Sequence, residues 1–270
     1  MSNQKSKMSR IQQLFKKKSS KVLNIYCTAG YPQLDSALKV MKALQNNGAD
    51  IIELGMPYSD PLADGPVIQE SGAIALHNGM SIKVLFEQLK GMRYLHGDYS
   101  AKITVPVILM GYMNPVLQYG FEKFCADASA AGVDGLILPD LPIREFETEY
   151  GPLMKKYGLD FIFLITPETS VERIRRIDAL STGFIYAVSS SSTTGKDKNF
   201  SDVELYLQKL QQMELKNPVL VGFGIKDKAT FESACKYANG AIIGSAYIKA
   251  LNENQEVELT TRKFLETIFK

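Results

Sequence analysis

The sequence is poor in the residues on which several common chemistries depend. It contains no tryptophan, only two histidines (His77 and His96) and three widely spaced cysteines. An odd, scattered set of cysteines argues against a disulfide framework and indicates free thiols in a reducing compartment, so we expect a cytoplasmic protein. Metal sites need clustered His, Cys or carboxylate ligands, and the two histidines lie around a predicted helical region rather than together. We therefore expect no metal.

Strong charge and long apolar runs are also missing. The chain has 270 residues, a net charge of +2, 45% hydrophobic residues and 22% charged ones. This composition is typical of a globular protein with one sizeable core. Its apolar runs are broken by glycine, proline or polar residues well short of a membrane span. Nothing in the charge balance attracts nucleic acid or a membrane, and we expect neither as a partner.

Acidic residues are absent before Asp35, while lysine and arginine are frequent there. Such a basic segment is also typical of an organelle transit peptide. However, Met8, Ile11, Leu14 and Phe15 follow helical spacing. The pattern favours a short amphipathic helix within residues 1–20, packed under the domain with its basic face in solvent.

Apolar strands alternate with amphipathic helices along the rest of the chain. Eight strands are expected, at about 22–28, 50–54, 105–110, 135–138, 160–165, 183–188, 218–221 and 241–243. Nearly continuous apolar strands indicate a parallel sheet covered by helices, and about 250 residues is the usual length of a (β/α)8 (TIM) barrel. We predict one such α/β domain over residues 1–270, with an extra N-terminal helix. An open doubly wound sheet is the alternative, but it more often has its glycine-rich loop after the first strand.

The most unusual stretch is 53–66, which has three carboxylates, three prolines and two glycines in fourteen positions. Glu53 ends a buried strand, where loss of solvation raises a carboxyl pKa toward the range useful for proton transfer. Asp64 could reach over the barrel mouth to hold a donor on a substrate. Asp60 suits turn capping as well as chemistry. For Glu53 itself, a purely structural ion pair or hydrogen bond remains the alternative.

Glycines gather after the seventh and eighth strands, at 222–225 and 240–245. Barrels of this class commonly hold phosphate there, with backbone N–H groups and a hydroxyl such as that of Ser245. Tight turns are the simpler explanation of these glycines. Aromatic and methionine side chains near strand ends predict a flat apolar substrate portion; they are Tyr26, Met110, Tyr112, Tyr186 and Phe223. No lysine at a strand end suits a Schiff base. The Ser/Thr-rich stretch 189–199 is typical of a mobile lid.

The stretch 53–66, together with Ile68-Gln69, closely resembles the signature of the tryptophan synthase alpha subunit family. Matching segments follow in the right order through nearly the whole chain, so the resemblance is specific. They are 26–30 (YCTAG), 111–115 (GYMNP), 134–135 (DG), 139–142 (PDLP), 194–195 (TG), 222–225 (GFGI) and 244–245 (GS).

The resemblance implies a (β/α)8 barrel that cleaves indole-3-glycerol phosphate to indole and glyceraldehyde 3-phosphate, a lyase reaction of tryptophan biosynthesis. By resemblance, Glu53 protonates the indole ring carbon and then accepts the side-chain hydroxyl proton, while Asp64 binds the ring N–H. The expected substrate-binding residues are Tyr26, Met110, Tyr186 and Phe223 around the indole, Gly195, Gly224, Gly244 and Ser245 at the phosphate, Thr194 beside Asp64 in the closed lid, and Asp140. From its position after Pro139, Asp140 could instead pin a neighbouring loop or cap a helix.

The family's partner is a beta subunit that carries pyridoxal phosphate, so the resemblance implies an alpha2beta2 complex and no cofactor in this chain. The Asp60 loop, the Asn114-Pro115 region and the sixth loop are expected near the interface. The sequence departs from the family at Ser192, where a glycine is common, and at Tyr26, where a phenyl ring is common. Two alternatives remain: a sugar-phosphate isomerase or epimerase on the same barrel, and a non-enzymatic activator of the beta subunit.

Overall fold

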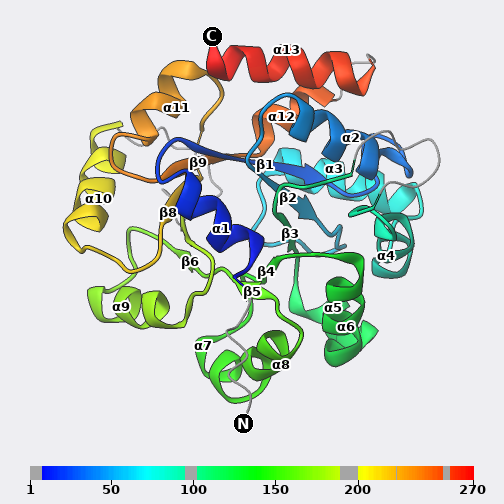
Figure 1. The fold of residues 1–270 in the computed structure, drawn as a ribbon, viewed down its shortest axis with the longest axis horizontal. Coiled ribbons are helices and arrows are strands. Elements are labelled where there is room, and N and C mark those ends of the chain that lie inside the picture. Colours follow the sequence, from blue (N-terminus) through cyan, green and yellow to red (C-terminus); the bar gives the residue numbers. More distant parts are fainter. Residues whose placement is uncertain (1–7, 95–101, 189–199, 223, 252–255) are drawn as a thin grey trace.

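The computed structural model describes residues 8–94, 102–188, 200–222, 224–251 and 256–270. Within these residues the strands form one nine-stranded sheet surrounded by helices (Figure 1). The strands are β1 (Val22–Thr28), β2 (Ile51–Gly55), β3 (Val107–Met110), β4 (Gly135–Ile137), β5 (Asp160–Phe161), β6 (Leu164–Ile165), β7 (Ile185–Val188), β8 (Val219–Gly222) and β9 (Gly240–Ile243).

The helices lie between most successive strands and on the outside of the sheet, except for α1, which precedes β1. They are α1 (Arg10–Lys17), α2 (Ser36–Asn46), α3 (Pro66–His77), α4 (Ile82–Leu89), α5 (Met113–Tyr119), α6 (Phe121–Ala131), α7 (Ile143–Glu145), a π-helical turn (Phe146–Tyr150), α8 (Gly151–Lys156), α9 (Val171–Leu180), α10 (Phe200–Gln212), α11 (Lys228–Ala234), α12 (Ser245–Leu251) and α13 (Val257–Phe269). In the described ranges, no helix combines the length and apolar character needed to cross a bilayer.

The sheet closes on itself, which confirms the predicted barrel. Its strand order is β5-β4-β3-β2-β1-β9-β8-β7-β6, and all the pairs are parallel. The two end strands, β5 and β6, are separated in the chain only by Ile162 and Phe163. Ile162 N donates to Leu136 O at 3.0 Å, and Phe163 O accepts from Tyr186 N at 2.9 Å. The predicted fifth strand, 160–165, is therefore one barrel strand in two pieces.

Alternation along β1 shows how the strands divide the core. Leu23 and Ile25 are fully buried in the large cluster between the sheet and the helices. Val22 belongs instead to the cluster inside the barrel, with one residue from most of the other strands. Because side chains alternate between the two faces of a strand, Asn24 and Tyr26 also project into the barrel. The interior is thus apolar near the start of the strands and carries polar groups higher up.

One predicted helical region differs in detail from the structure, whereas the predicted N-terminal helix is present. The sequence predicts one helical region after the second strand, at about 68–89. In the structure it divides into α3 and α4, and the Ser81 hydroxyl caps α4 by accepting from Val84 N at 3.3 Å. At the N-terminus, Ser9 caps α1 in the same way, with Gln12 N as the donor at 3.2 Å. Ile11 of α1 is fully buried against the barrel interior, and in Figure 1 α1 crosses the middle of the ring of strands.

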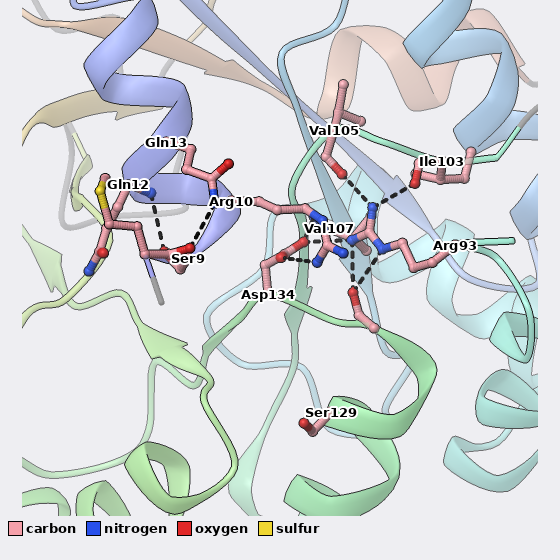
Figure 2. Close-up of polar contacts among 12 residues, drawn as sticks. Ser9, Arg10, Gln12, Gln13, Arg93, Ile103, Val105, Val107, Ser129 and Asp134 are labelled. Atoms are coloured by element: carbon pink, nitrogen blue, oxygen red, sulfur yellow. Dashed lines mark hydrogen bonds and ion pairs between the residues drawn. The ribbon is translucent and has the colours of Figure 1, made fainter. Parts of the chain in front are cut away.

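A buried ion pair ties three distant segments together near the start of β4 (Figure 2). Arg93 Nη2 lies 2.6 Å from Asp134 Oδ2, and Arg10 Nη1 of α1 lies 2.8 Å from Asp134 Oδ1. The Arg93 and Asp134 side chains are 8% and 4% exposed. Arg93 also donates to the carbonyl oxygens of Ile103, Val105 and Gly132. Burial lowers the Arg93 pKa to about 10, which still leaves the guanidinium charged at neutral pH.

Candidate active site

A cavity of about 450 Å³ lies at the carboxyl ends of the barrel strands. Its walls come from β1, β2, β3, β6, β7, β8 and β9 and from the segments that follow β2, β4, β8 and β9. Eight of the twelve predicted site residues line it: Tyr26, Glu53, Asp64, Met110, Tyr186, Gly224, Gly244 and Ser245. This is the end of a (β/α)8 barrel at which catalytic groups are found.

Glu53 reaches this cavity from inside the barrel. It is the third residue of β2, between Tyr26 on β1 and Ile108 on β3 in the parallel register, and it is 1% exposed. Burial raises the Glu53 pKa to about 7, although a hydrogen bond from Asn24 opposes the rise and the nearby Asp64 adds to it. A carboxyl that is half protonated near neutrality can both give and accept a proton at that pH.

Asp64 enters from the loop after β2 and is half-buried. Loss of solvation raises its pKa to about 6, and a hydrogen bond with the Tyr112 hydroxyl counteracts this. The same hydroxyl accepts from Ala63 N at 3.1 Å, and Gln69 Nε2 donates to Asp64 O at 2.8 Å. The loop is therefore held from both sides, and Asp64 remains mostly ionised at neutral pH.

Two tyrosine rings form part of the cavity wall, and each lies over a glycine. A β-carbon placed on Gly55 would stand 2.0 Å from the Tyr26 hydroxyl oxygen, and one on Gly222 would stand 2.4 Å from that of Tyr186. Only glycine lets the rings lie this close to the neighbouring backbone. Burial raises the pKa of both phenols, so the rings are neutral. The hydroxyl of Tyr26 is hydrogen-bonded to Thr28.

The β8 and β9 side of the cavity has the features of an anion site. Gly224, Gly244 and Ser245 line it, as predicted from the glycine-rich loops. Lys226 and Lys249 line it as well. Neither lysine was among the site residues predicted from the sequence. Lys249 stands four residues after Ser245 in α12, a helical spacing that places both near one face and could have drawn attention to it.

Asp140 lies elsewhere. Both of its carboxylate oxygens accept from Met113 N, each at 3.0 Å, so it holds the start of α5. It is not among the residues that line the cavity. The structure thus places Asp140 where it pins the neighbouring helix, and its role in substrate binding remains a prediction. Asp60 is exposed, and its carboxylate accepts from the Ser59 hydroxyl at 2.5 Å.

The remaining predicted residues, Thr194, Gly195 and Phe223, lie outside the residues that the structure describes, as does Ser192. Asn24 was missed altogether. An amide in the middle of an apolar strand is not distinctive in sequence, and only the register shows that it faces the same interior as Glu53. Among the described residues, no group of three or more His, Cys, Asp or Glu side chains could hold a metal ion.

The fold and the cavity together define a barrel enzyme with two carboxyl groups of shifted pKa beside a site for an anion. Comparison with known proteins gives the family. Residues 12–269 match the family model described as "Tryptophan synthase alpha chain". The chain belongs to the tryptophan synthase alpha chain family. It is therefore a carbon–carbon lyase subunit that cleaves indole-3-glycerol phosphate to indole and glyceraldehyde 3-phosphate in tryptophan biosynthesis.

Individual relatives agree with this assignment. The chain is 51% identical to the tryptophan synthase alpha chain of Flavobacterium johnsoniae, covering 92% of this chain and 95% of the relative. It is 46% identical to that of Bacteroides thetaiotaomicron, covering 97% and 100%. Among solved structures, tryptophan synthase subunit alpha from Legionella pneumophila superposes with a TM-score of 0.84 at 32% identity, covering 97% of each chain. These matches set aside the isomerase and epimerase alternative.

Proposed function

We propose that Glu53 moves the proton in the cleavage reaction and that Asp64 is the anion that stabilises the charged ring. The observation that carries this proposal is that both carboxyl groups line one cavity and have different pKa values, about 7 for Glu53 and about 6 for Asp64. Near pH 6.5 one can be protonated while the other is ionised, which is the pair of states that the reaction needs.

The chemistry follows from the bond that must break. Protonated Glu53 gives its proton to the indole ring carbon that bears the glycerol phosphate chain, and a ring double bond supplies the electron pair. The positive charge that results is shared with the ring nitrogen, where the Asp64 carboxylate accepts the N–H and stabilises it. Glu53 then takes the proton of the adjacent side-chain hydroxyl. As the carbon–carbon bond breaks, its electrons return to the ring, so that indole and an aldehyde leave and Glu53 is again protonated.

The substrate fits the cavity in one direction. The tyrosine rings and Met110 provide an apolar wall for the indole. The phosphate is best placed on the β8 and β9 side, where Gly224, Gly244 and Ser245 offer N–H and hydroxyl donors. Lys226 and Lys249 add positive charge at the same place. Three predicted roles are retained: Thr194 beside Asp64 in the closed lid, Gly195 at the phosphate and Phe223 beside the indole.

The test is indole release from indole-3-glycerol phosphate by the purified chain, alone and with a beta subunit. Loss of the general acid–base group lowers such rates by roughly 10²- to 10⁴-fold, so Glu53→Gln is expected to release almost no indole. Glu87→Gln on α4, an exposed glutamate with a Lys90 partner, is the matched control and keeps the wild-type rate. Equal rates for Glu53→Gln and wild type would remove Glu53 from the mechanism.

For partner and location, we propose an alpha2beta2 complex in the cytoplasm, with pyridoxal phosphate held by the beta subunit. The loop after β2 and α5 form adjoining surface, since Asn114 Nδ2 donates to the Tyr58 hydroxyl at 3.0 Å. Leu62 and Leu117 on these segments are 88% and 47% exposed, which suits a protein interface. Replacing Leu62 by Asp is expected to weaken binding to the beta subunit, whereas replacing the exposed Leu205 of α10 is not. Equal affinities in a titration would move the interface elsewhere.

A further inference from the structure

The side chain of Asn24 lies inside the barrel, where it forms a hydrogen bond to Glu53. It is fully buried, and Asn24 Nδ2 donates to Glu53 Oε2 at 2.7 Å. On its own strand it stands between Val22, part of the apolar interior cluster, and Tyr26 of the cavity wall. Its register partners are Ile51 of β2 and Ile242 of β9, which belong to the same cluster. The Asn24 amide is therefore a polar group next to the apolar interior cluster, directly beneath Glu53.

The other half of this amide is unsatisfied. Within the described part of the chain, Asn24 Oδ1 is buried and has no hydrogen-bond partner. A buried acceptor without a partner is destabilising, while an apolar side chain of the same shape would incur no such loss. The unpartnered Oδ1 is therefore a destabilising feature of an amide at this position. The amide also provides a hydrogen-bond donor, Nδ2, and this donor is directed at Oε2 of Glu53.

We propose that Asn24 is a positioning residue for the lyase reaction: its amide holds Oε2 of Glu53 as an acceptor, so that the proton moving to and from the substrate is carried on Oε1. An oxygen that already accepts the Asn24 N–H is a poorer site for the proton. Glu53 lines the cavity, so a proton confined to Oε1 is presented to the ring carbon and later returns to the same atom. Asn24 itself does not touch the reacting atoms. This inference rests on the proposed role of Glu53.

Other titratable groups near Glu53 do not replace this role. They are Asp64 from the loop after β2, Tyr26 and Cys27 from β1, and Tyr186 from β7. Burial raises the pKa of both phenols and of the Cys27 thiol, so these three are neutral in the working range. Asp64 supplies negative charge, which opposes ionisation of Glu53. Asn24 is the neighbour whose hydrogen bond favours the ionised form of Glu53.

The test is the pH profile of indole formation by Asn24→Leu, a nearly isosteric change that removes the donor. A hydrogen bond to a charged group is strong enough that its loss should move the alkaline limb of kcat/KM upward by about one pH unit. At the optimum, kcat should fall about tenfold because the proton is no longer fixed to one oxygen, while KM stays within about twofold. Ile25→Val, a truncation at the neighbouring outward-facing position, is the control and keeps the wild-type limb.

A second measurement does not depend on catalysis. In the wild-type background, the free energy of unfolding falls with pH until Glu53 of the folded protein has ionised. Asn24→Leu should raise the Glu53 pKa, so this fall should continue to a higher pH. In the Glu53→Gln background it should leave the pH dependence of unfolding unchanged. If Asn24→Leu does not fold, Asn24→Val takes its place. Suppose that the wild type is active and Glu53→Gln is inactive. If Asn24→Leu then keeps the wild-type kcat and the wild-type alkaline limb of kcat/KM, this inference alone is overturned. An active Glu53→Gln would overturn the proposed role of Glu53 instead.

Discussion

The hydroxyl of Tyr26 occupies the space where a side chain of Gly55 would begin: a β-carbon on Gly55 would stand 2.0 Å from that oxygen. Gly55 pairs with Thr28 of β1 and Met110 of β3, so the backbone beneath the ring is fixed by the barrel on both sides. The position of the Tyr26 ring therefore depends on the absence of a side chain on the next strand.

Gly55→Ala is expected to push the Tyr26 ring into the cavity and so to weaken substrate binding. Because the strand cannot yield, we expect KM for indole-3-glycerol phosphate to rise by roughly tenfold or more, with a loss of stability of about 1–3 kcal/mol from overpacking. Steady-state kinetics and urea unfolding measure the two effects. Gly72→Ala in α3, where a β-carbon meets no atom within 4 Å, is the control. An unchanged KM would show that the Tyr26 ring can shift without entering the space that the substrate occupies.

The activity should follow a bell-shaped pH profile. In the free enzyme, Asp64 must be ionised and Glu53 protonated for the first step, and their pKa values are about 6 and about 7. We therefore expect kcat/KM to fall below about pH 6, as Asp64 gains a proton, and above about pH 7, as Glu53 loses one. The same assay with Asp64→Asn should lose the acid limb. It should also move the alkaline limb to lower pH, because the Asp64 charge raises the Glu53 pKa. A flat profile from pH 5 to 9 would contradict both assignments.

Glu53 should destabilise the folded chain at alkaline pH. Its pKa rises from an ordinary 4.5 to about 7 on folding, so between these values the folded protein holds a proton that the unfolded chain has released. Stability consequently falls as pH increases through this range, by up to roughly 3 kcal/mol. Glu53→Gln lacks this loss. Urea unfolding at pH 5 and pH 8 should show a smaller drop for the variant than for wild type, and equal drops would mean that Glu53 is not held neutral by burial.

The Arg93–Asp134 pair should be costly to break from either side. Removing one partner leaves a charge buried without compensation, and such changes typically cost about 3–5 kcal/mol. Arg93→Met and Asp134→Asn are each expected to lower the free energy of unfolding by this order, as measured with urea. Lys123→Met removes the cation of an exposed pair with Asp127 and should cost less than about 1 kcal/mol. Similar values for all three would show that the pair is solvated.

Local patterns were sufficient to predict most of the barrel. Apolar runs bounded by glycine and polar residues predicted β1 at its observed limits, 22–28, and the other strands to within about two residues. The break in the fifth strand at Ile162 and Phe163 was not predictable, because both residues are apolar and suit a continuous strand. The break lies where the strand stops pairing with β4 and starts pairing with β7. This change of partner depends on closure of the whole sheet.

The cavity was predictable in part for a related reason. The sequence predicted that β2 ends on Glu53, but β2 continues to Gly55. Glu53 and Met110 still meet, because the carboxyl-terminal parts of parallel strands lie on one side of the barrel. Contacts between side chains of different loops could not be read in advance. The Tyr112 hydroxyl reaches Asp64, and Asp140 turns away toward Met113, as a result of loop geometry that sequence spacing does not specify. Asn24 is the plainest example, since its meaning depends on which residue stands beside it on β2.

Barrel closure also has a consequence for how the chain is made. β1 pairs with β9, so that Val22 lies beside Gly240 and Ile25 beside Ile243. A ribosome releases β1 long before β9 exists, and during that interval one edge of the growing sheet has no neighbour to accept its hydrogen bonds. Contacts this distant in sequence form slowly, and open strand edges invite aggregation. Asn24 and Glu53 thus cannot be enclosed in the barrel until the last strand, β9, has been synthesised.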